Sequence, residues 1–271
     1  MTTDLPDAAA DDPIRRLFSL AGRTAVVTGG SRGIGFMIAD TLVRAGVDVV
    51  ISARKAEACR EAAERLSEHG SAHAVPADLS TEAGAHELAG AVRERFGALN
   101  LLVNNAGASW GAPLEEFPDS GWDKVIDTNV RGVFRLTTAL LPELRKAATP
   151  GDPARVVNVG SIDGLRVPDM ENYSYSASKA AVHMLTRHLA KRLAGESITV
   201  NAIAPGPFES KMTAFFLADP ESRAAVSRTV PLGRIGEPDD VAGATIFLAS
   251  RAGAYLTGVV IPVDGGITGA G

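Results

Sequence analysis

The sequence predicts one α/β domain in which a parallel sheet of seven strands is covered by helices on both faces. From Arg23 onward, short apolar runs rich in Val and Ile alternate with amphipathic stretches, which is typical of parallel strands joined by crossover helices. The 271 residues, 45% of them hydrophobic, can bury a large core, and no linker rich in Pro and Gly divides the chain. We therefore expect a flexible N-terminal arm at residues 1–20 and one doubly wound domain at residues 21–271.

The apolar runs locate the seven strands and leave one long interruption. The strands are expected at residues 24–29, 48–53, 72–78, 99–107, 154–161, 198–206 and 259–266, with a helix between each pair. Residues 207–236 separate the sixth strand from the last helix. Because a long insertion at the carboxyl end of a strand often closes over a ligand, this segment is predicted to be a lid.

Composition excludes several classes of protein. The net charge of -5 argues against a nucleic-acid partner, which usually requires a basic face. The single cysteine, Cys59, cannot form an internal disulfide. The start lacks the apolar stretch of a secretory signal, and no apolar run approaches the roughly 20 residues that cross a bilayer. The histidines show no metal-ligand spacing, so we expect a cytoplasmic protein without a metal site.

The first expected strand leads into a glycine-rich turn and then a helix. Gly29, Gly33 and Gly35 lie in the stretch TGGSRGIG, where they allow a tight turn and leave N–H groups exposed at the start of a helix. Such groups bind anions. This Rossmann-like arrangement predicts a dinucleotide whose pyrophosphate lies on the turn, and a purely structural turn is the alternative.

The end of the second expected strand distinguishes NADP(H) from NAD(H). An Asp or Glu at that point would bind a free ribose 2′-hydroxyl, but the residues there are Ser52, Arg54 and Lys55, and Arg32 lies in the glycine turn. Asp48 is at the opposite end of the strand. Arginine side chains suit a 2′-phosphate. The sequence therefore favours NADP(H), unless these cations are ordinary solvated loop residues.

Two tyrosines stand close to one lysine in NYSYSASK, residues 172–179. In a helix, Tyr175 and Lys179 share a face because they are four positions apart, whereas Tyr173 lies about 120° away around the axis. A nearby ammonium can lower the pKa of a phenol from its usual value near 10. We therefore expect Tyr175 to be the acid/base group, with its pKa lowered by Lys179, and Tyr173 to pack or to form a pocket wall.

Several motifs together resemble those of the short-chain dehydrogenase/reductase family from about residue 20 to the end. In order along the chain they are TGGSRGIG, NNAG at 104–107, NV at 129–130, Ser161, YSASK at 175–179 and APG at 204–206. The resemblance implies an oxidoreductase that acts on a CH–OH group or its carbonyl. It also implies hydride transfer between NADP(H) and a carbinol carbon.

The resemblance assigns a role to each matching residue. Tyr175 would exchange a proton with the substrate oxygen, and Ser161 would donate a hydrogen bond to that oxygen. Lys179 would hold the nicotinamide ribose, and Asn129 would anchor a water. The implied catalytic set is Asn129, Ser161, Tyr175 and Lys179. The implied cofactor-binding set is Gly29, Ser31, Arg32, Gly33, Ile34, Gly35, Ser52, Arg54, Lys55, Asp78, Leu79, Asn105, Ala106, Gly107, Tyr175, Lys179, Pro205, Gly206 and Ser210.

The chain departs from the family pattern in small ways. Gly160 stands where a second serine is frequent, and Ser210 occupies a place often held by threonine. The plainer alternatives are that Ser161 is a turn residue, Asn129 braces a helix and Lys179 lies on the surface.

Within the family, the stretch RLFSLAGRTAVVTGGSRGIG, the GASWGA loop and the YSYSASK pair are similar to the β-ketoacyl reductases related to rhamnolipid biosynthesis. This similarity implies reduction of a 3-oxoacyl thioester. Arg135 matches a basic position that docks acyl carrier protein, but Glu196 occupies a second such position, so coenzyme A thioesters and free ketones stay open. Further alternatives are a polyol, gluconate or steroid dehydrogenase and a non-catalytic NADP(H) sensor. The resemblance also implies a homotetramer.

Overall fold

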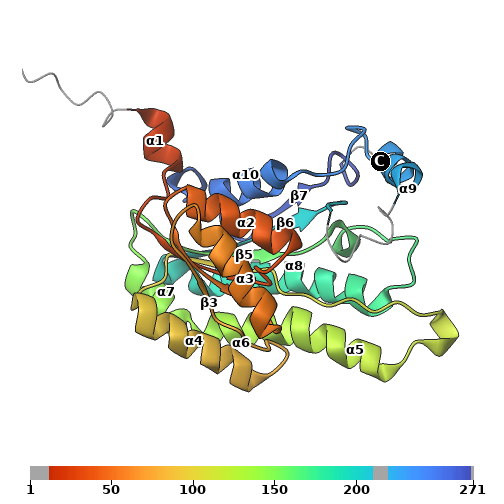
Figure 1. The fold of residues 1–271 in the computed structure, drawn as a ribbon, viewed down its shortest axis with the longest axis horizontal. Coiled ribbons are helices and arrows are strands. Elements are labelled where there is room, and N and C mark those ends of the chain that lie inside the picture. Colours follow the sequence, from red (N-terminus) through yellow and green to blue (C-terminus); the bar gives the residue numbers. More distant parts are fainter. Residues whose placement is uncertain (1–11, 210–218, 270–271) are drawn as a thin grey trace, which may run out of the picture.

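The computed structural model describes residues 12–209 and 219–269. Seven parallel strands form one sheet in the order β3-β2-β1-β4-β5-β6-β7 (Figure 1). The strands are β1 (Thr24–Thr28), β2 (Asp48–Ser52), β3 (Ala72–Ala74), β4 (Leu101–Asn104), β5 (Ala154–Val159), β6 (Ile198–Pro205) and β7 (Val260–Val263). Each lies within the run predicted for it, which confirms the fold class. The strand order reverses between β1 and β4, where doubly wound sheets bind their ligands.

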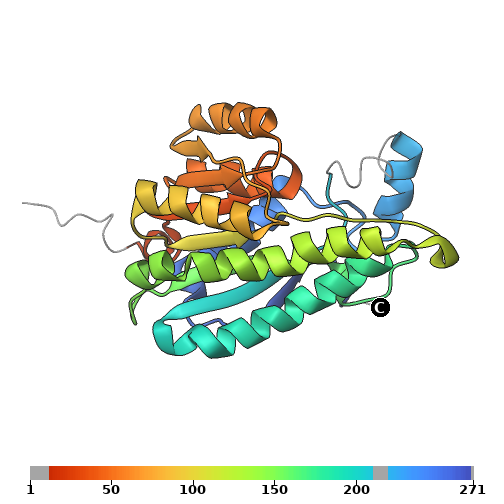
Figure 2. The ribbon, with the colours of Figure 1, turned by 90° about the horizontal axis from the view of Figure 1, so that it is seen from below.

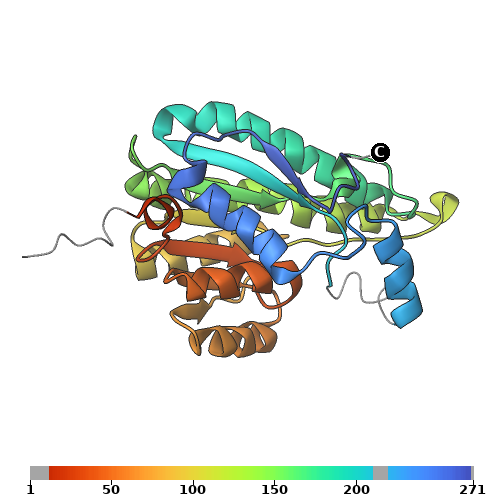
Figure 3. The ribbon, with the colours of Figure 1, turned by 90° about the horizontal axis from the view of Figure 1, so that it is seen from above.

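The helices cover both faces of the sheet. They are α1 (Pro13–Phe18), α2 (Gly33–Arg44), α3 (Ala56–Ser67), α4 (Glu82–Phe96), α5 (Asp119–Ile126), α6 (Gly132–Ala139), α7 (Leu141–Ala147), α8 (Tyr173–Leu193), α9 (Pro220–Arg228) and α10 (Pro238–Ala249). Figure 2 shows α4, α6 and α8 on one side, and Figure 3 shows α2 and α10 on the other. None of the helices within the described residues is long and apolar enough to span a membrane.

Two hydrophobic cores lie on the two sides of the sheet. Successive strand residues point to opposite faces, so Val27 packs in the core with Ile38 and Leu42 of α2, whereas its neighbour Val26 packs with Leu136 of α6. All five side chains are buried. This packing on both faces explains why the strands are nearly continuous apolar runs in the sequence. It also holds the carboxyl ends of the strands in fixed positions.

The N-terminal segment predicted as a flexible arm is only partly described. Residues 1–11 lie outside the described residues, but Pro13–Phe18 form helix α1, and Leu20 is buried. Asp12 caps this helix by accepting a hydrogen bond from the Ile14 amide at 2.9 Å, and proline is favoured in the first turn. The part of the arm that the structure describes therefore contains a short helix, and the flexibility of residues 1–20 stays a prediction.

The segment predicted as a lid is also only partly described. Residues 210–218, with Ser210, fall outside the described residues. The remainder of 207–236 contains helix α9, which Asp219 caps through the Ser222 amide. Its role as a lid stays a prediction.

Helices α5 and α6 are joined by a π-helical turn, η2 (Asp127–Arg131), and together form a long rod beside α8 (Figure 2). The turn places Asn129 against Ser178, in the first half of α8. Short π-helical insertions are frequent at functional sites. The 3₁₀ turn η3 (Ile162–Gly164) follows β5 and also contacts α8, so the two segments meet α8 near the ends of β4 and β5.

Candidate active site

A cleft of about 500 Å³ opens at the carboxyl ends of the strands, and most of the predicted site residues line it. Those that line it are Gly29, Ser31, Arg32, Gly33, Ile34, Ser52, Arg54, Asp78, Leu79, Asn105, Ala106, Gly107, Ser161, Tyr175, Lys179, Pro205 and Gly206. Gly35, Lys55 and Asn129 do not line it, and Ser210 lies outside the described residues. The glycine turn and the tyrosine–lysine pair therefore face one continuous space.

The glycine turn is held in shape by close backbone contacts. Gly29 has a φ of 66°, which favours glycine, and its amide donates to the Ser52 carbonyl at 2.7 Å. A Cβ on Gly35 would collide with the Gly29 carbonyl oxygen and the Asn105 side-chain amide. Gly35 does not line the cleft, and its lack of a side chain lets α2 begin directly under the turn.

The start of α2 suits an anion. Arg32 stands at the N-cap, and its side chain makes no capping hydrogen bond, so it leaves the first amides of the helix uncapped. The neighbouring Ser52 hydroxyl is buried and has no hydrogen-bond partner within the described part of the chain. Free amides at a helix start and an unpaired hydroxyl at the end of β2 fit the pyrophosphate and ribose of a dinucleotide.

The charges beside Ser52 favour a 2′-phosphate. Arg32 and Arg54 line the cleft with exposed side chains, and no ion pair engages either of them within residues 12–209 and 219–269. Lys55 is the exposed N-cap residue of α3, and it does not line the cleft. Asp48 lies at the opposite end of β2, as predicted, and its carboxylate is hydrogen-bonded to His73 Nε2 at 3.0 Å.

Hydrogen bonds join the loop after β4 to the end of β1. Thr28 Oγ1 accepts hydrogen bonds from the amides of Asn105 and Ala106, both at 2.9 Å, and Asn105 Nδ2 donates to the Thr28 carbonyl at 2.9 Å. Asp78 accepts two hydrogen bonds from Ser80. These contacts fix the walls of the cleft, and they leave the backbone of Gly107 facing Lys179, with the Nζ atom 3.9 Å from an ideal Cβ position.

The two tyrosines of NYSYSASK separate as the helix geometry predicts. Tyr175 and Lys179 are one turn apart on α8, with Lys179 Nζ 5.5 Å from the Tyr175 ring centroid. Tyr173 begins the helix, and its ring packs edge-on against Phe117 with centroids 5.5 Å apart. Tyr173 is therefore a packing residue outside the cleft.

The pKa of Tyr175 differs from the expectation that Lys179 lowers it. Burial raises the pKa of Tyr175 to about 12, the nearby Ser161 hydroxyl opposes this rise and the Asp163 carboxylate adds to it. Burial also lowers the pKa of Lys179 to about 8. The Lys179 Nζ atom donates to the Val159 carbonyl at 2.8 Å rather than to the phenol. Desolvation therefore outweighs the attraction between the two groups.

Asn129 is buried and its side chain is fully hydrogen-bonded. Nδ2 donates to the Ala108 carbonyl and to Ser178 Oγ, both at 2.9 Å, while Oδ1 accepts from the Ala108 amide at 2.7 Å. This side chain braces the loop after β4 against α8, beside the lysine. Its place next to the cleft rather than in it agrees with a supporting role.

Eight further residues that line the cleft were not predicted from the sequence. They are Ala53, Ala77, Ala108, Ser109, Lys124, Thr128, Val159 and Gly160. Most lie at the end of a predicted strand or directly after one, so their position in the sequence was an available signal. Phe208, in the segment predicted as a lid, also lines the cleft. Lys124 was not recognisable, because it reaches the cleft only through packing of α5, where its Nζ lies 4.9 Å from the centroid of the Trp110 ring.

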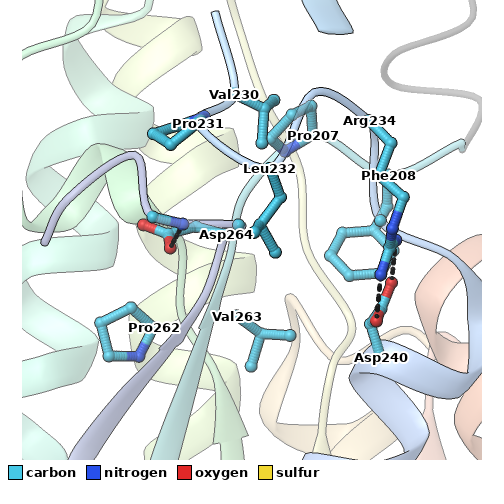
Figure 4. Close-up of a pocket in the computed structure, with 13 residues that line it drawn as sticks. Pro207, Phe208, Val230, Pro231, Leu232, Arg234, Asp240, Pro262, Val263 and Asp264 are labelled. Carbon is cyan, nitrogen blue, oxygen red and sulfur yellow. Dashed lines mark hydrogen bonds and ion pairs between the residues drawn. The ribbon is translucent and has the colours of Figure 1, made fainter. Parts of the chain in front are cut away.

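A second cavity, of about 530 Å³, lies between the residues before α10 and the end of β7 (Figure 4). Arg234 pairs with Asp240 through two hydrogen bonds there and lowers the pKa of that carboxyl to about 2. Phe208 lines both cavities and is buried. None of the predicted catalytic residues lines the second cavity.

Comparison with known proteins agrees with this geometry. The family model for enoyl-(acyl carrier protein) reductase matches residues 29–268. A rhamnolipids biosynthesis 3-oxoacyl-[acyl-carrier-protein] reductase from Pseudomonas aeruginosa is 55% identical over 249 residues, which cover 92% of this chain and 97% of that protein. A 3β-hydroxysteroid dehydrogenase from Eggerthella lenta is 39% identical over 92% of this chain and 95% of its own.

Solved structures give the same result. The P. aeruginosa RhlG/NADP active-site complex is similar with a TM-score of 0.91 and 54% identity, covering 93% of this chain and 99% of that chain. A gluconate 5-dehydrogenase from Burkholderia cenocepacia, in complex with NADP and tartrate, has a TM-score of 0.85 and 32% identity, covering 93% and 98%. With its parallel sheet, glycine turn and Ser161, Tyr175 and Lys179 in one cleft, the chain belongs to the short-chain dehydrogenase/reductase family.

Proposed function

We propose that the protein is an NADPH-dependent reductase that converts a 3-oxoacyl thioester to a 3-hydroxyacyl thioester. The observation that carries this proposal is the single cleft that joins the cations Arg32 and Arg54 to the hydroxyls of Ser161 and Tyr175. The similarity to a 3-oxoacyl reductase at 55% identity and to the RhlG/NADP complex supports both the substrate class and the cofactor.

The residues at the phosphate end would hold the cofactor. The turn at Gly29 and the first amides of α2 would bind the pyrophosphate, and Arg32 and Arg54 the 2′-phosphate. Asp78 would lie near the adenine, and Pro205 and Gly206 near the nicotinamide. When bound, NADPH supplies the hydride.

Tyr175 would donate the proton that the reduced carbonyl oxygen needs. A pKa of about 12 keeps the phenol protonated at neutral pH, so the proton is present when the oxygen gains negative charge. Ser161, which is close enough to lower the Tyr175 pKa, would donate a hydrogen bond to the same oxygen. The Lys179 ammonium would stabilise the phenolate after transfer, and Asn129 would keep the helix in place.

The loops around the catalytic end suit an acyl chain. Leu165 and Met170, between η3 and α8, are each more than 40% exposed, and exposed apolar side chains beside a cleft favour an apolar ligand. The dehydrogenases of steroid and gluconate are 39% and 36% identical, against 55% for the 3-oxoacyl reductase. A thioester is therefore the favoured substrate over a sugar acid or a sterol.

The carrier of the acyl group is proposed to be acyl carrier protein. The 55% identical relative is named as a reductase of 3-oxoacyl groups attached to that carrier. Arg135 donates to the Ser80 carbonyl at 3.0 Å, and Glu196 is paired with Arg145 at 2.6 Å and with Arg192. The acidic residue at the second docking position is therefore surrounded by arginines, which lessens its repulsion of an acidic carrier.

A homotetramer in the cytoplasm completes the proposal. Phe134 on α6 and Met184 on α8 are exposed large apolar residues, and Tyr255, close to β7, is fully exposed. Exposed apolar residues on elements at the edge of a domain favour contact with another subunit. Light scattering on the purified protein should give about four times the mass of the 28.1 kDa chain.

The function is tested by following NADPH oxidation with 3-oxoacyl thioesters of increasing chain length, on coenzyme A and on acyl carrier protein, beside gluconate-type and steroid ketones. The expected result is turnover of the thioesters with kcat/KM rising with chain length, and a higher kcat/KM with NADPH than with NADH. Preferred turnover of a sugar acid or steroid would replace the substrate assignment. Binding of NADPH without turnover of any carbonyl would identify a sensor instead.

A further inference from the structure

The His183 side chain fills the space behind the loop that carries Ser161. His183 lies on α8 one turn after Lys179, and only 3% of its surface is exposed. A Cβ built on Gly160 would collide with ring atom Nε2 of His183, whereas a Cβ on Gly164 would first meet the α8 backbone at Lys179 and Ala180, 2.7 Å away, and then Cε1 of the His183 ring at 2.9 Å. The imidazole therefore rests directly against the backbone on both sides of Ser161, with no room for a side chain at either glycine.

The two glycines bracket the Ser161 loop, which is otherwise held by backbone hydrogen bonds. The Gly160 amide donates to the Ile203 carbonyl of β6 at 2.7 Å, and the Gly164 amide donates to the Ser161 carbonyl at 3.0 Å. Ser161 Oγ accepts from the Asp163 amide at 3.1 Å. A shift of either glycine would therefore move the Ser161 hydroxyl.

The same face of α8 carries Tyr175, Lys179 and His183 at intervals of four residues. Lys179 is bonded to the Val159 carbonyl, at the end of β5, and His183 contacts the residue that follows it, Gly160. The lysine and the histidine thus join the helix that bears Tyr175 to the strand end that bears Ser161. The separation of the two hydroxyls depends on these contacts.

The ring contributes its shape rather than its charge. Neither ring nitrogen makes a well-aligned hydrogen bond with the residues that the structure describes, although the Gly164 backbone lies close to the ring. Burial lowers the pKa of His183 to about 4, the Gly164 backbone opposes this change, and the charges of Lys179 and Arg187 add to it. The imidazole is therefore neutral at the pH of the proposed reaction.

We propose that His183 is a positioning residue that sets the separation of the Ser161 and Tyr175 hydroxyls, with the absence of a side chain at Gly160 leaving the space that its ring fills. This inference rests on the proposed reductase function, because the two hydroxyls act together only if a carbonyl oxygen lies between them. His183 touches neither substrate nor cofactor and acts through Ser161.

The catalytic part is tested with His183→Ala measured alone and in a Ser161→Ala background. We expect His183→Ala to lower kcat about 10-fold while KM for NADPH changes less than about 2-fold, because misplacement of a catalytic group reduces the rate of the chemical step. In the Ser161→Ala background the same substitution should leave kcat almost unchanged. An equal loss of kcat in both backgrounds would overturn the proposal, since it would show that His183 does not act through Ser161.

A shape-conserving variant separates positioning from chemistry at the ring. His183→Leu keeps a buried side chain of similar volume without the nitrogens, so kcat should stay within about 3-fold of the unsubstituted enzyme. A loss as large as that of His183→Ala would show that the nitrogens are required and would contradict the shape argument.

The fit between ring and glycine is tested without any activity measurement. Gly160→Ser should lower the thermal midpoint because the new side chain collides with the ring, and adding His183→Ala should recover at least half of that loss. Additive losses would overturn the proposed fit. If the unsubstituted protein reduces no carbonyl, the proposed function fails, and this stability cycle still decides whether the ring and the glycine form one packed unit.

Discussion

The two ends of the cleft are built from different parts of the chain. At the phosphate end, the ligand would meet backbone amides, a glycine turn and the exposed arginines Arg32 and Arg54, whose side chains are in solvent. At the chemical end, it would meet Ser161, Tyr175 and Lys179, whose polar groups are largely desolvated and whose two titrating members have strongly shifted pKa values. Under the proposed function, one end would bind through backbone amides and exposed charges, and the other would react through largely buried side chains.

This difference implies different responses to substitution. Exposed cations act through a high dielectric, so each one changes affinity modestly and can be replaced with little effect on stability. Buried polar groups cost folding free energy to desolvate and are retained for chemistry. Substitutions at the chemical end should therefore change activity and stability in opposite directions, whereas those at the phosphate end should change cofactor affinity alone.

The largest expected effect is that of Tyr175→Phe. Removing the proton donor should lower kcat by about 10²- to 10⁴-fold, the usual contribution of general acid catalysis, while the dissociation constant for NADPH stays nearly constant. Tyr173→Phe is the matched control, since its ring packs on Phe117 outside the cleft, and it should retain full kcat. Steady-state kinetics and cofactor fluorescence measure both quantities. Comparable losses in the two variants would remove the distinction between the tyrosines.

Lys179→Met tests the opposition between activity and stability. Because burial lowers the pKa of Lys179 from 10.5 to about 8, the charged lysine destabilises the fold at neutral pH, by about 3 kcal/mol if the whole shift is counted. We expect kcat to fall at least about 10-fold and the free energy of unfolding at pH 7 to rise by about 1–3 kcal/mol. The gain should shrink as pH rises from 8 to 10.5, where the lysine is neutral in both states.

The control for this prediction is Lys124→Met, which removes an exposed lysine that lines the same cleft. It should leave the free energy of unfolding within about 0.5 kcal/mol of the unsubstituted value. Chemical denaturation at several pH values gives both results. A stability loss in Lys179→Met at every pH would mean that the bond to the Val159 carbonyl outweighs the cost of desolvation.

Arg54→Asp tests the phosphate end and should change cofactor affinity without changing stability. The new carboxylate repels a 2′-phosphate and can accept a hydrogen bond from a free 2′-hydroxyl, so KM for NADPH should rise about 10- to 100-fold with little change for NADH. Arg60→Asp is the control, because Arg60 lies on α3 outside the cleft and pairs with Glu57. The thermal midpoints of both variants should stay close to that of the unsubstituted protein. Equal changes in KM for both cofactors would refute the assignment of Arg54 to the 2′-phosphate.

The sequence predicted best what depends on local pattern. Apolar runs located all seven strands, the glycine spacing located the turn at Gly29, and the four-residue interval placed Tyr175 and Lys179 on one face of α8. Each of these features needs only the periodicity of a strand or a helix and the conformational freedom of glycine. The aspartate and proline at positions 12 and 13 were also an available signal for α1, although the segment was predicted as a loose arm.

Features that depend on long-range packing were not predictable. The pKa of Tyr175 was expected to fall because its charged neighbour is visible in the sequence, but the burial that raises it comes from distant segments. The histidines were interpreted from the sequence as lacking metal-ligand spacing, and nothing near His183 in the chain indicates that its ring lies against Gly160, 23 positions earlier. Desolvation and cavity filling are properties of the folded core rather than of a motif.

The smallest expected effect is the acid sensitivity that His183 gives to the chemical end. Its folded-state pKa of about 4 lies below the ordinary value of 6.5, so the unfolded chain binds more protons and stability falls as pH drops from 6.5 towards 4. His183 should account for a loss of about 2 kcal/mol in the free energy of unfolding between pH 8 and pH 5. His183→Leu should remove this loss, as measured by urea denaturation at the two pH values.

His188→Gln is the matched control for this measurement, because His188 is an exposed histidine on the same helix, and its replacement should leave the pH dependence as it is in the unsubstituted protein. If His183→Leu kept the full loss of stability between pH 8 and pH 5, the acid-sensitive group would have to be sought elsewhere. If it removed the loss, the buried ring behind Ser161 would be the source, and the chemical end would differ from the phosphate end in its response to pH as well as in its response to substitution.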